Sequence, residues 1–259
     1  MTQKEKREYL IGELIGEFPQ YADIRIPEDE EGQKHLLRSL MNVRPPRPVS
    51  DTFLEVQDAY LGEEAARRGV TDGMALPETM PGSRIVLWQG DITTLKADAI
   101  VNAANSALRG CFAPCHSCID NMIHSRSGVQ LRLICDKMMN EQGHDEPTGR
   151  AKITPAYNLP ARHVIHTVGP VLAGPLSQEH CRQLASCYRS CLSLAAREGL
   201  RSIAFCCIST GEFHFPQEKA AEIAVRTVRE FLREDTQIER VIFNVFKDAD
   251  REIYQRLLL

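Results

Sequence analysis

The segment Ala99-Ile100-Val101-Asn102-Ala103-Ala104-Asn105 decides the fold class of this chain. Its first residues form a short, apolar and partly β-branched run, which predicts a buried strand at residues 99–103. A second apolar run at residues 84–88 precedes it, and an apolar stripe at helical spacing follows it over residues 118–139. Strands that alternate with helices in this way are typical of an α/β fold.

The same alternation continues to the C-terminus. We predict further strands at residues 151–157, 163–168, 202–209 and 240–246. Helices are predicted at residues 177–198, from Pro216 onward, and at the end of the chain. Cys187 and Cys191 fall on the apolar stripe of the 177–198 helix, so we expect them in the core. Six strands with interleaved helices predict a three-layer α/β/α domain around a mixed, largely parallel sheet.

Residues 1–80 have a different pattern, which predicts a helical N-terminal extension to a domain at residues 81–259. Apolar residues recur at helical spacing in residues 8–18 and 33–43. Thr52 and Glu55 have the spacing of a capping box, which predicts that they begin a third helix. The apolar stripes of these helices need a partner surface, and the simplest one is the domain that follows.

Composition limits the classes of function. The chain has 259 residues and a formal net charge of −4, and no basic stripe that would favour nucleic acid is visible. Its nine cysteines and the lack of an apolar leader predict a reducing compartment, with the cytoplasm as the default. No apolar run is long enough to span a membrane. The expected partner is a small molecule or a protein.

Metal-ligating residues are concentrated just after the asparagine loop. Cys111, His116 and Cys118 have a Cys-x4-His-x-Cys spacing, which offers two thiolates and an imidazole. Three protein ligands with an open fourth position are typical of catalytic zinc, whereas structural zinc normally has four. The spacing therefore predicts a zinc site, although each of these cysteines, taken alone, is more typical of a buried core residue. His124 is expected to be a packed histidine and not a ligand.

Three loops that follow predicted strands have the composition of a ligand site. They are residues 89–93, 101–106 and 209–213. In open α/β sheets, ligands bind where strand ends meet loops and helix N-termini. Asp91 in the first loop has the chemistry to accept a hydrogen bond from an amino group such as adenine N6, or alternatively to cap a turn. The glycine-containing backbone of the third loop favours an anion such as a diphosphate.

Four segments together resemble the macrodomain family, which binds ADP-ribose. They are Gly90-Asp91-Ile92-Thr93, Ala99-Ile100-Val101-Asn102-Ala103-Ala104-Asn105, Val164-Ile165-His166-Thr167-Val168-Gly169-Pro170 and Ser209-Thr210-Gly211. Most macrodomains carry a run of glycines after the asparagine loop, where this sequence has its cysteine- and histidine-containing loop. That difference resembles the zinc-dependent macrodomains, microbial protein-ADP-ribose hydrolases that also have a helical N-terminal extension. The resemblance covers about residues 84–259.

The resemblance implies a set of ligands and partners. It implies one zinc ion per chain, held by Cys111, His116 and Cys118. It implies a substrate protein of the acyl- or lipoyl-carrier class that a sirtuin-like transferase modifies. It also implies ADP-ribose contacts with the adenine beside Asp91 and Ile92, the distal ribose beside Asn105 and Asp120, and the diphosphate over Ser209, Thr210, Gly211, Glu212 and Phe213. Ile119 is a further expected contact of ADP-ribose.

These residues support removal of mono-ADP-ribose by cleavage at the anomeric carbon of the distal ribose. Zinc acts as a Lewis acid and lowers the pKa of bound water towards roughly 7. Asp120 is the first candidate acid or base, with helix capping as its alternative role. Glu212 is a second candidate acid or base, and Asn105 is a further candidate catalytic residue. An ester to aspartate or glutamate is easier to break than an N-glycosidic bond, because carboxylate is the better leaving group. We therefore expect an acidic acceptor residue.

Two other classes of function compete with this interpretation. Residues 114–118 match the P-C-x-x-C half of zinc nucleobase deaminases, but no upstream His-x-Glu accompanies it. A non-catalytic ADP-ribose-binding module would use the same three loops. In that case the zinc would be a closed structural site, with Cys115 as a fourth ligand. Metal content and turnover distinguish the module from the hydrolase.

Overall fold

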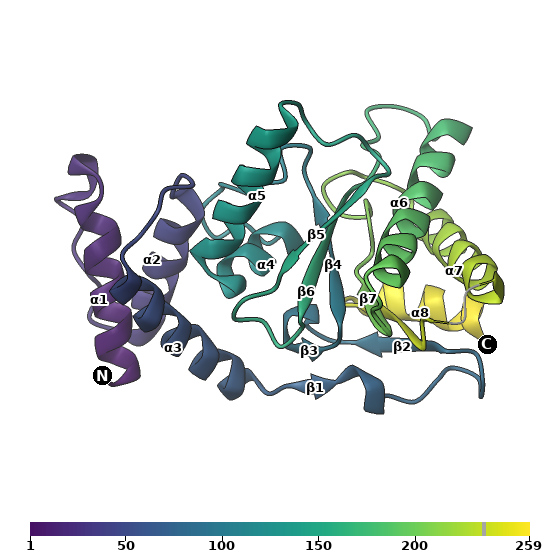
Figure 1. Ribbon diagram of the computed structural model, residues 1–259, viewed down its shortest axis with the longest axis horizontal. Coiled ribbons are helices and arrows are strands. Elements are labelled where there is room, and N and C mark those ends of the chain that lie inside the picture. Colours follow the sequence, from purple (N-terminus) through teal and green to yellow (C-terminus); the bar gives the residue numbers. More distant parts are fainter. Residues whose placement is uncertain (235–236) are drawn as a thin grey trace.

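The computed structural model describes residues 1–234 and 237–259. Its main sheet has six strands in the order β2-β8-β7-β4-β6-β5 (Figure 1). Neighbours pair in parallel except β5, which is antiparallel to β6. The predicted mixed, largely parallel sheet is confirmed. The strands are β2 Ile85–Gln89, β4 Ala99–Ala104, β5 Ala151–Pro155, β6 His163–Val168, β7 Ser202–Phe205 and β8 Arg240–Val245.

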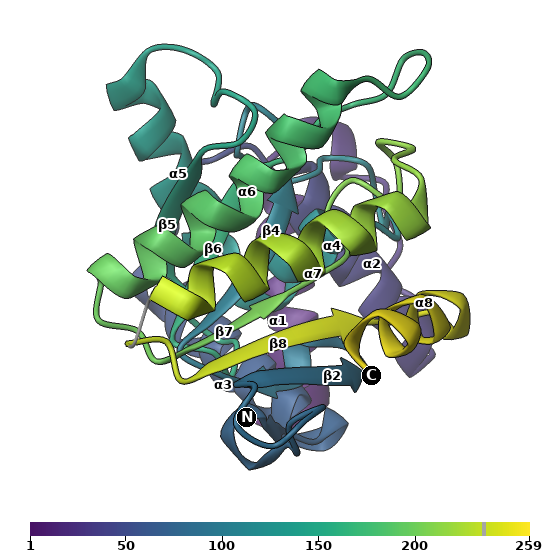
Figure 2. The same ribbon diagram turned by 90° about the vertical axis from the view of Figure 1, so that its right-hand side faces the viewer.

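Helices cover both faces of this sheet. On one face lie α4 (Ile119–Ser127) and α5 (Val129–Gln142). On the other lie α6 (Gln178–Arg197), α7 (Gln217–Glu234) and α8 (Asp248–Leu258) (Figures 1 and 2). Because both faces are covered, the central strands are buried and mostly apolar, and side chains such as Ile100 have no exposed area. Cys187 and Cys191 on α6 are fully buried in the core, as predicted.

The N-terminal extension is helical up to Arg68 and has its own apolar core. It consists of α1 (Gln3–Gly16), α2 (Glu30–Val43) and α3 (Asp51–Arg68), and lies beside α4 and α5 at the left of Figure 1. Val129 of α5 belongs to the same apolar cluster as the extension, so the two parts share a packed boundary. After Arg68 the chain differs from the predicted helical pattern. Short strands β1 (Thr71–Asp72) and β3 (Leu95–Lys96) pair in parallel there.

The structure corrects three boundaries. The single helix predicted at residues 118–139 is wrong, because Gly128 has φ +99° and separates α4 from α5. The strand predicted at 202–209 ends at Phe205. The third helix is capped by Ser50 and not by Thr52, since the Phe53 amide donates to the Ser50 hydroxyl at 3.1 Å. Spacing identified these three elements but not their ends.

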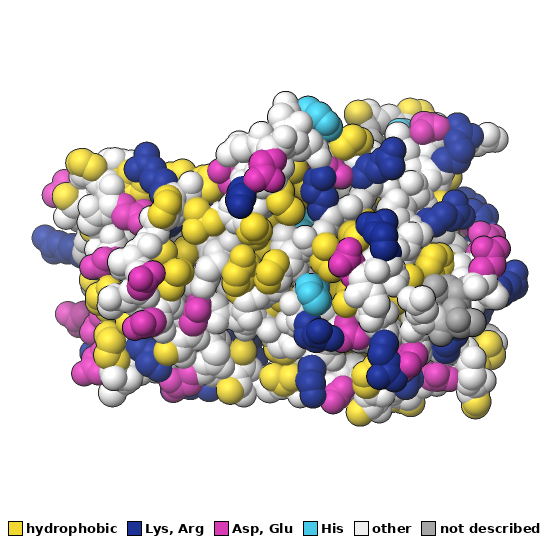
Figure 3. All heavy atoms as spheres, in the orientation of Figure 1, with side chains coloured by type: hydrophobic (Ala, Val, Ile, Leu, Met, Phe, Trp, Pro, Cys, Tyr) yellow, Lys and Arg dark blue, Asp and Glu magenta, His cyan; other side chains and the backbone are white. Residues whose placement is uncertain are grey.

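Two further features bear on the kind of partner. Within residues 1–234 and 237–259, no helix is long and apolar enough to cross a membrane. On the face in Figure 3, acidic and basic side chains are interspersed, and hydrophobic side chains show between them. That face therefore carries no continuous basic patch of the kind that nucleic acid favours.

Candidate active site

A cleft of about 680 Å³ opens at the carboxyl ends of the parallel strands. That volume lies within the range of small-molecule and cofactor sites. All predicted site residues except His116 line it. They come from all three predicted loops and the metal loop: Asp91, Ile92, Asn105, Cys111, Cys118, Ile119, Asp120, Ser209, Thr210, Gly211, Glu212 and Phe213.

The metal loop (residues 111–118) brings its three predicted ligands together. The ligand atoms of Cys111, His116 and Cys118 all lie within 4.8 Å of one another. Cys115 is not part of this cluster: its amide donates to Asn42 Oδ1 at 2.9 Å, and its thiol faces the His35 carbonyl oxygen at 3.4 Å. The arrangement therefore offers three ligands and not the four of a closed structural site.

Gly110 and His124 shape the start of the metal loop. Gly110 has φ +80°, which side chains disfavour, and a Cβ there would lie 2.7 Å from the His124 ring. The His124 side chain is buried, and burial lowers its pKa well below the ordinary value, so the ring is neutral. His124 is packed against the backbone, as expected.

The donor set fits zinc. Burial, with Cys111 adding to it, raises the pKa of the Cys118 thiol to about 12. Two neighbouring thiolates therefore need a cation to offset their charge, and thiolate with imidazole is a set that zinc prefers. Glu212 Oε1 lies 3.8 Å from His116 Nε2 across the cleft. This places the third loop next to the metal loop.

Asp120 is held by two amides beside the metal ligands. Asn102 Nδ2 donates to its Oδ1 at 2.8 Å and Asn105 Nδ2 donates to its Oδ2 at 3.2 Å. The carboxyl is buried, and burial raises its pKa to about 6. The alternative role of helix cap is wrong for Asp120, because the Cys118 sulfur is the acceptor that caps α4, from the Asn121 amide. The Asp120 carboxyl is thus held by β4 and its loop at the wall of the cleft.

A buried histidine supports this carboxylate from behind. His166 on β6 faces Asn102 Nδ2 at 3.2 Å and the Thr154 hydroxyl at 2.9 Å. Burial lowers the pKa of His166 to about 4, so the ring is neutral. His124, Cys135 and His166 form a second group of ligand-type atoms within 4.8 Å. Both ring nitrogens of His166 already face protein partners there.

Asp91 caps a turn in the cleft wall, which is one of the two roles that its loop suggested. It lines the cleft, and its carboxylate caps the 3-10 turn at Ile92–Thr94 by accepting from the Thr93 amide at 3.0 Å. Burial raises its pKa, but hydrogen bonds from Thr93 and Arg126 together outweigh burial and leave the pKa lowered. Asp91 is therefore a charged acceptor in the cleft wall.

The third loop presents donors to the cleft. Ser209 has φ +65°. The loop is closed by a hydrogen bond in which the Phe215 amide donates to the Ser209 carbonyl oxygen at 2.9 Å. Among the described residues, the amides of Gly211, Glu212 and Phe213 have no protein acceptor. Consecutive free amides next to a helix N-terminus suit an anion.

Several cleft residues were missed at the level of sequence, among them Phe246, Arg126 and Arg38. Phe246 follows β8 and exposes 75% of its surface at the rim; its position at the end of a predicted strand was the available signal. Arg126 on α4 pairs with Asp91. Arg38 reaches the cleft from α2 in the extension, and no local pattern marks it.

Known proteins resemble this chain in sequence and in fold. The family described as Macro domain matches residues 101–224. A protein-ADP-ribose hydrolase from Treponema medium is 55% identical over 261 residues, and the alignment covers 100% of both chains. One from Staphylococcus aureus (strain MRSA252) is 50% identical over 98% of this chain and 95% of its own length. The solved Trypanosoma brucei macrodomain in complex with ADP-ribose aligns with a TM-score of 0.67 and 31% identity, over 86% of this chain and 95% of that one.

Proposed function

This chain belongs to the macrodomain family, and we propose that it is a zinc-dependent hydrolase that removes mono-ADP-ribose from modified proteins. Relatives named protein-ADP-ribose hydrolase match over essentially their whole length, which supports the reaction. One observation carries the metal dependence. Cys111, His116 and Cys118 converge within 4.8 Å in the same cleft as Asp120 and the diphosphate-type loop.

Different residues of the chain bind different parts of ADP-ribose. Asp91 accepts from the adenine amino group, with Ile92 beside it, and the free amides of residues 211–213 hold the diphosphate. This orientation places the distal ribose next to Asn105 and Asp120, with Ile119 in the wall. Binding energy at the remote adenine thereby fixes the position of the reacting carbon.

Hydrolysis then needs a water and a proton acceptor at the anomeric carbon. Zinc, when bound by the three ligands, supplies Lewis acidity next to that carbon. The bond between the anomeric carbon and the acceptor oxygen breaks, and the leaving carboxylate keeps the electron pair. The water oxygen bonds to the carbon, and Asp120 accepts the water proton. Asn105 orients Asp120, and Glu212 is a second acid or base at the rim.

The acceptor residue and the partner protein are inferred on separate grounds. We infer an ester to aspartate or glutamate, because a carboxylate leaves more easily than an amide or guanidine nitrogen. The resemblance to zinc-dependent macrodomains supports a lipoyl- or acyl-carrier protein modified by a sirtuin-like transferase as the substrate. Nine free cysteines support a reducing, cytoplasmic location.

Metal analysis paired with turnover tests this function. Purified protein is expected to carry about one zinc per chain and to release ADP-ribose from a protein modified on aspartate or glutamate. Removal of zinc with a chelator should abolish release, and added zinc should restore it. Full activity of the stripped protein contradicts the metal dependence. Zinc binding and ADP-ribose binding without any release would instead indicate a non-catalytic module.

A further inference from the structure

We propose that helix α2 of the N-terminal extension is part of the metal centre, with Arg38 as the residue that positions the metal loop. The proposal rests on the zinc site of the proposed function. It assigns the extension a role in metal affinity, beyond packing against α4 and α5.

Arg38 connects the metal loop to the first turn of α4. Its Nη2 donates to the carbonyl oxygen of the ligand His116 at 2.6 Å and to Asn121 Oδ1 at 2.7 Å. The guanidinium is therefore shared between the backbone of one ligand and the side chain of a fully buried asparagine. Bonds from a charged donor to two fixed acceptors restrict geometry more than a neutral bond does.

Asn121 passes this restraint to the other two ligands. Its Nδ2 donates to the carbonyls of Ala113 at 2.9 Å and Cys111 at 3.4 Å. Its backbone amide faces the Cys118 sulfur at 3.4 Å. Arg38 of α2 thus contacts the backbone of His116 directly, and Asn121 of α4, which Arg38 holds, contacts the backbone of Cys111 and the sulfur of Cys118.

A second attachment lies one turn further along α2. Asn42 Oδ1 accepts from the Cys115 amide at 2.9 Å, and Asn42 Nδ2 donates to the Ser125 hydroxyl at 2.8 Å. Cys115 has φ +51°, an uncommon conformation for a side-chain-bearing residue, at this point of the loop. The bond to Asn42 holds the loop where its own backbone preference would not.

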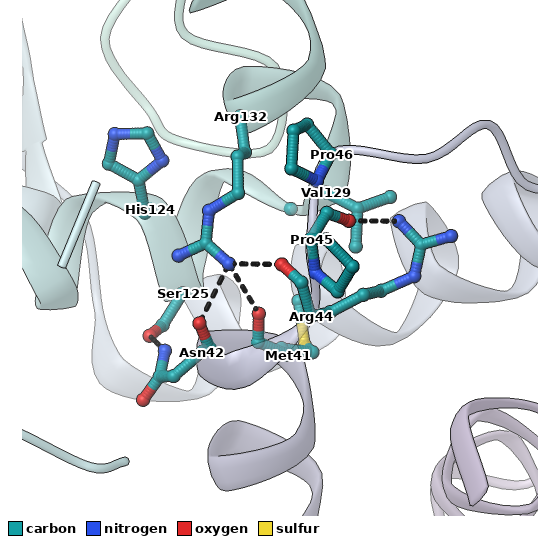
Figure 4. A pocket seen from close by; sticks show the side chains of 10 residues that line it. Met41, Asn42, Arg44, Pro45, Pro46, His124, Ser125, Val129 and Arg132 are labelled. Atoms are coloured by element: carbon teal, nitrogen blue, oxygen red, sulfur yellow. Dashed lines mark hydrogen bonds between the residues drawn. The ribbon is translucent and has the colours of Figure 1, made fainter. Parts of the chain in front are cut away.

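Arg132 of α5 fixes the end of α2 against the same loop (Figure 4). Its Nη1 donates to the carbonyls of Met41, Asn42 and Arg44, at 3.1, 2.7 and 2.6 Å, and its Nη2 reaches the Cys111 carbonyl at 3.3 Å. A positive charge at a helix C-terminus is stabilising. Because α2 is anchored in this way, Arg38 and Asn42 have defined positions.

The physical need for this support lies in the loop itself. Residues 111–118 contain no helix or strand, so their conformation has to be fixed by contacts from outside. Groups that orient metal ligands typically contribute about 10–100-fold in metal affinity. We therefore expect α2 to act on metal binding and not on folding alone.

Metal affinity of Arg38 variants in the full chain tests the proposal. Chelator-stripped wild-type protein, Arg38→Ala and Arg38→Lys would be titrated with Zn²⁺ against a chromogenic chelator and with Co²⁺ by its absorption bands. The expected result is a dissociation constant about 10–100-fold higher for Arg38→Ala. Arg38→Lys, which keeps the charge but lacks the forked donors, should be intermediate.

Lys34→Ala is the matched control, since Lys34 lies one turn earlier on α2 and pairs with Glu30 and Glu31 away from the cleft. It should bind metal like the wild type. Unfolding temperatures of the stripped proteins separate folding from positioning. If Arg38→Ala lowers the unfolding temperature but binds metal as tightly as wild type, the proposal is overturned and the zinc site stands. If wild-type protein itself binds no metal, the proposed function fails, and this inference with it.

Discussion

Asn105 and Asp120 are joined by a hydrogen bond across the metal side of the cleft, with Nδ2 of Asn105 3.2 Å from Oδ2 of Asp120. Asn102 holds the other oxygen from the preceding strand. Two amides on β4 and its loop therefore aim one carboxylate from α4. Because both donors are neutral amides, the Asp120 carboxylate is oriented next to Cys118 without a second charged group.

Replacement of Asp120 by asparagine tests its role in proton transfer. Asp120→Asn keeps the shape of the side chain but removes the proton acceptor, so turnover should fall by about 10²–10⁴-fold. Zinc content should stay at the wild-type level, because no predicted ligand is changed. Asp136→Asn, at a carboxylate that pairs with Arg109 outside the cleft, is the control. Turnover of Asp120→Asn within a few-fold of wild type would rule out this role.

Cys118→Ser separates metal binding from helix capping. Serine keeps an acceptor at the N-cap of α4, but its hydroxyl is a poor zinc ligand compared with a thiolate. Zinc content and ADP-ribose release should both be lost, as measured by metal analysis and product detection. Cys115→Ser, outside the ligand cluster, should keep both. The reverse outcome, loss with Cys115→Ser alone, would assign the site to Cys115.

Asp91→Ala should weaken ADP-ribose binding by about 10–100-fold, the amount expected for a hydrogen bond to a charged group. The turnover number at saturating substrate should change far less, because Asp91 lies at the adenine end. Asp72→Ala removes an equivalent cap, since Asp72 accepts from the Met74 amide at 3.0 Å outside the cleft. Calorimetric titration of both variants with ADP-ribose measures the difference. Equal affinity of both variants for ADP-ribose would contradict the role of Asp91 in binding.

Gly110→Ala should destabilise the fold by more than the left-handed conformation alone costs. A Cβ at Gly110 would lie 2.7 Å from the His124 ring, whereas at Gly143, with φ +76°, no atom lies within 4 Å. Gly143→Ala should cost about 1–2 kcal/mol, and Gly110→Ala about 1–3 kcal/mol more from overpacking. Urea unfolding of both variants measures this, and equal losses would show that His124 moves aside.

Burial of His166 predicts a pH dependence of stability. Its pKa is lowered to about 4 in the folded chain, so the unfolded chain binds more protons between that value and the ordinary one of about 6.5. The stabilisation is complete above about pH 6.5 and is lost as pH falls toward 4.

For the metal-free chain, His166→Gln should reduce the loss of unfolding free energy between pH 7 and 5 by about 2 kcal/mol. His144→Gln, at an exposed histidine, should leave the loss unchanged. Urea unfolding at the two pH values, with a chelator present, gives the comparison. If wild type and His166→Gln lost the same unfolding free energy between the two pH values, protonation of His166 would not destabilise the folded chain.

Local sequence determined the parts of this protein that depend on neighbours along the chain. The apolar runs gave six strands because a covered parallel sheet needs them. The Cys-x4-His-x-Cys spacing placed three ligands on one short loop, and the asparagine and glycine loops placed polar groups at strand ends. The helix predicted through Gly128 failed, because Gly128 has φ +99° and the next amide, that of Val129, donates to Gln57 of α3 at 2.9 Å, a partner that lies outside any local pattern.

Tertiary structure alone decided which distant groups complete the site. Arg38 reaches the His116 carbonyl across 78 positions of sequence, and Asp120 meets Asn102 and Asn105 only after α4 docks on β4. Such contacts depend on how whole helices pack, and periodicity reports only which face of a helix is apolar. The sequence therefore determined the chemistry available, and the docking of the extension and α4 decided how that chemistry is held in place.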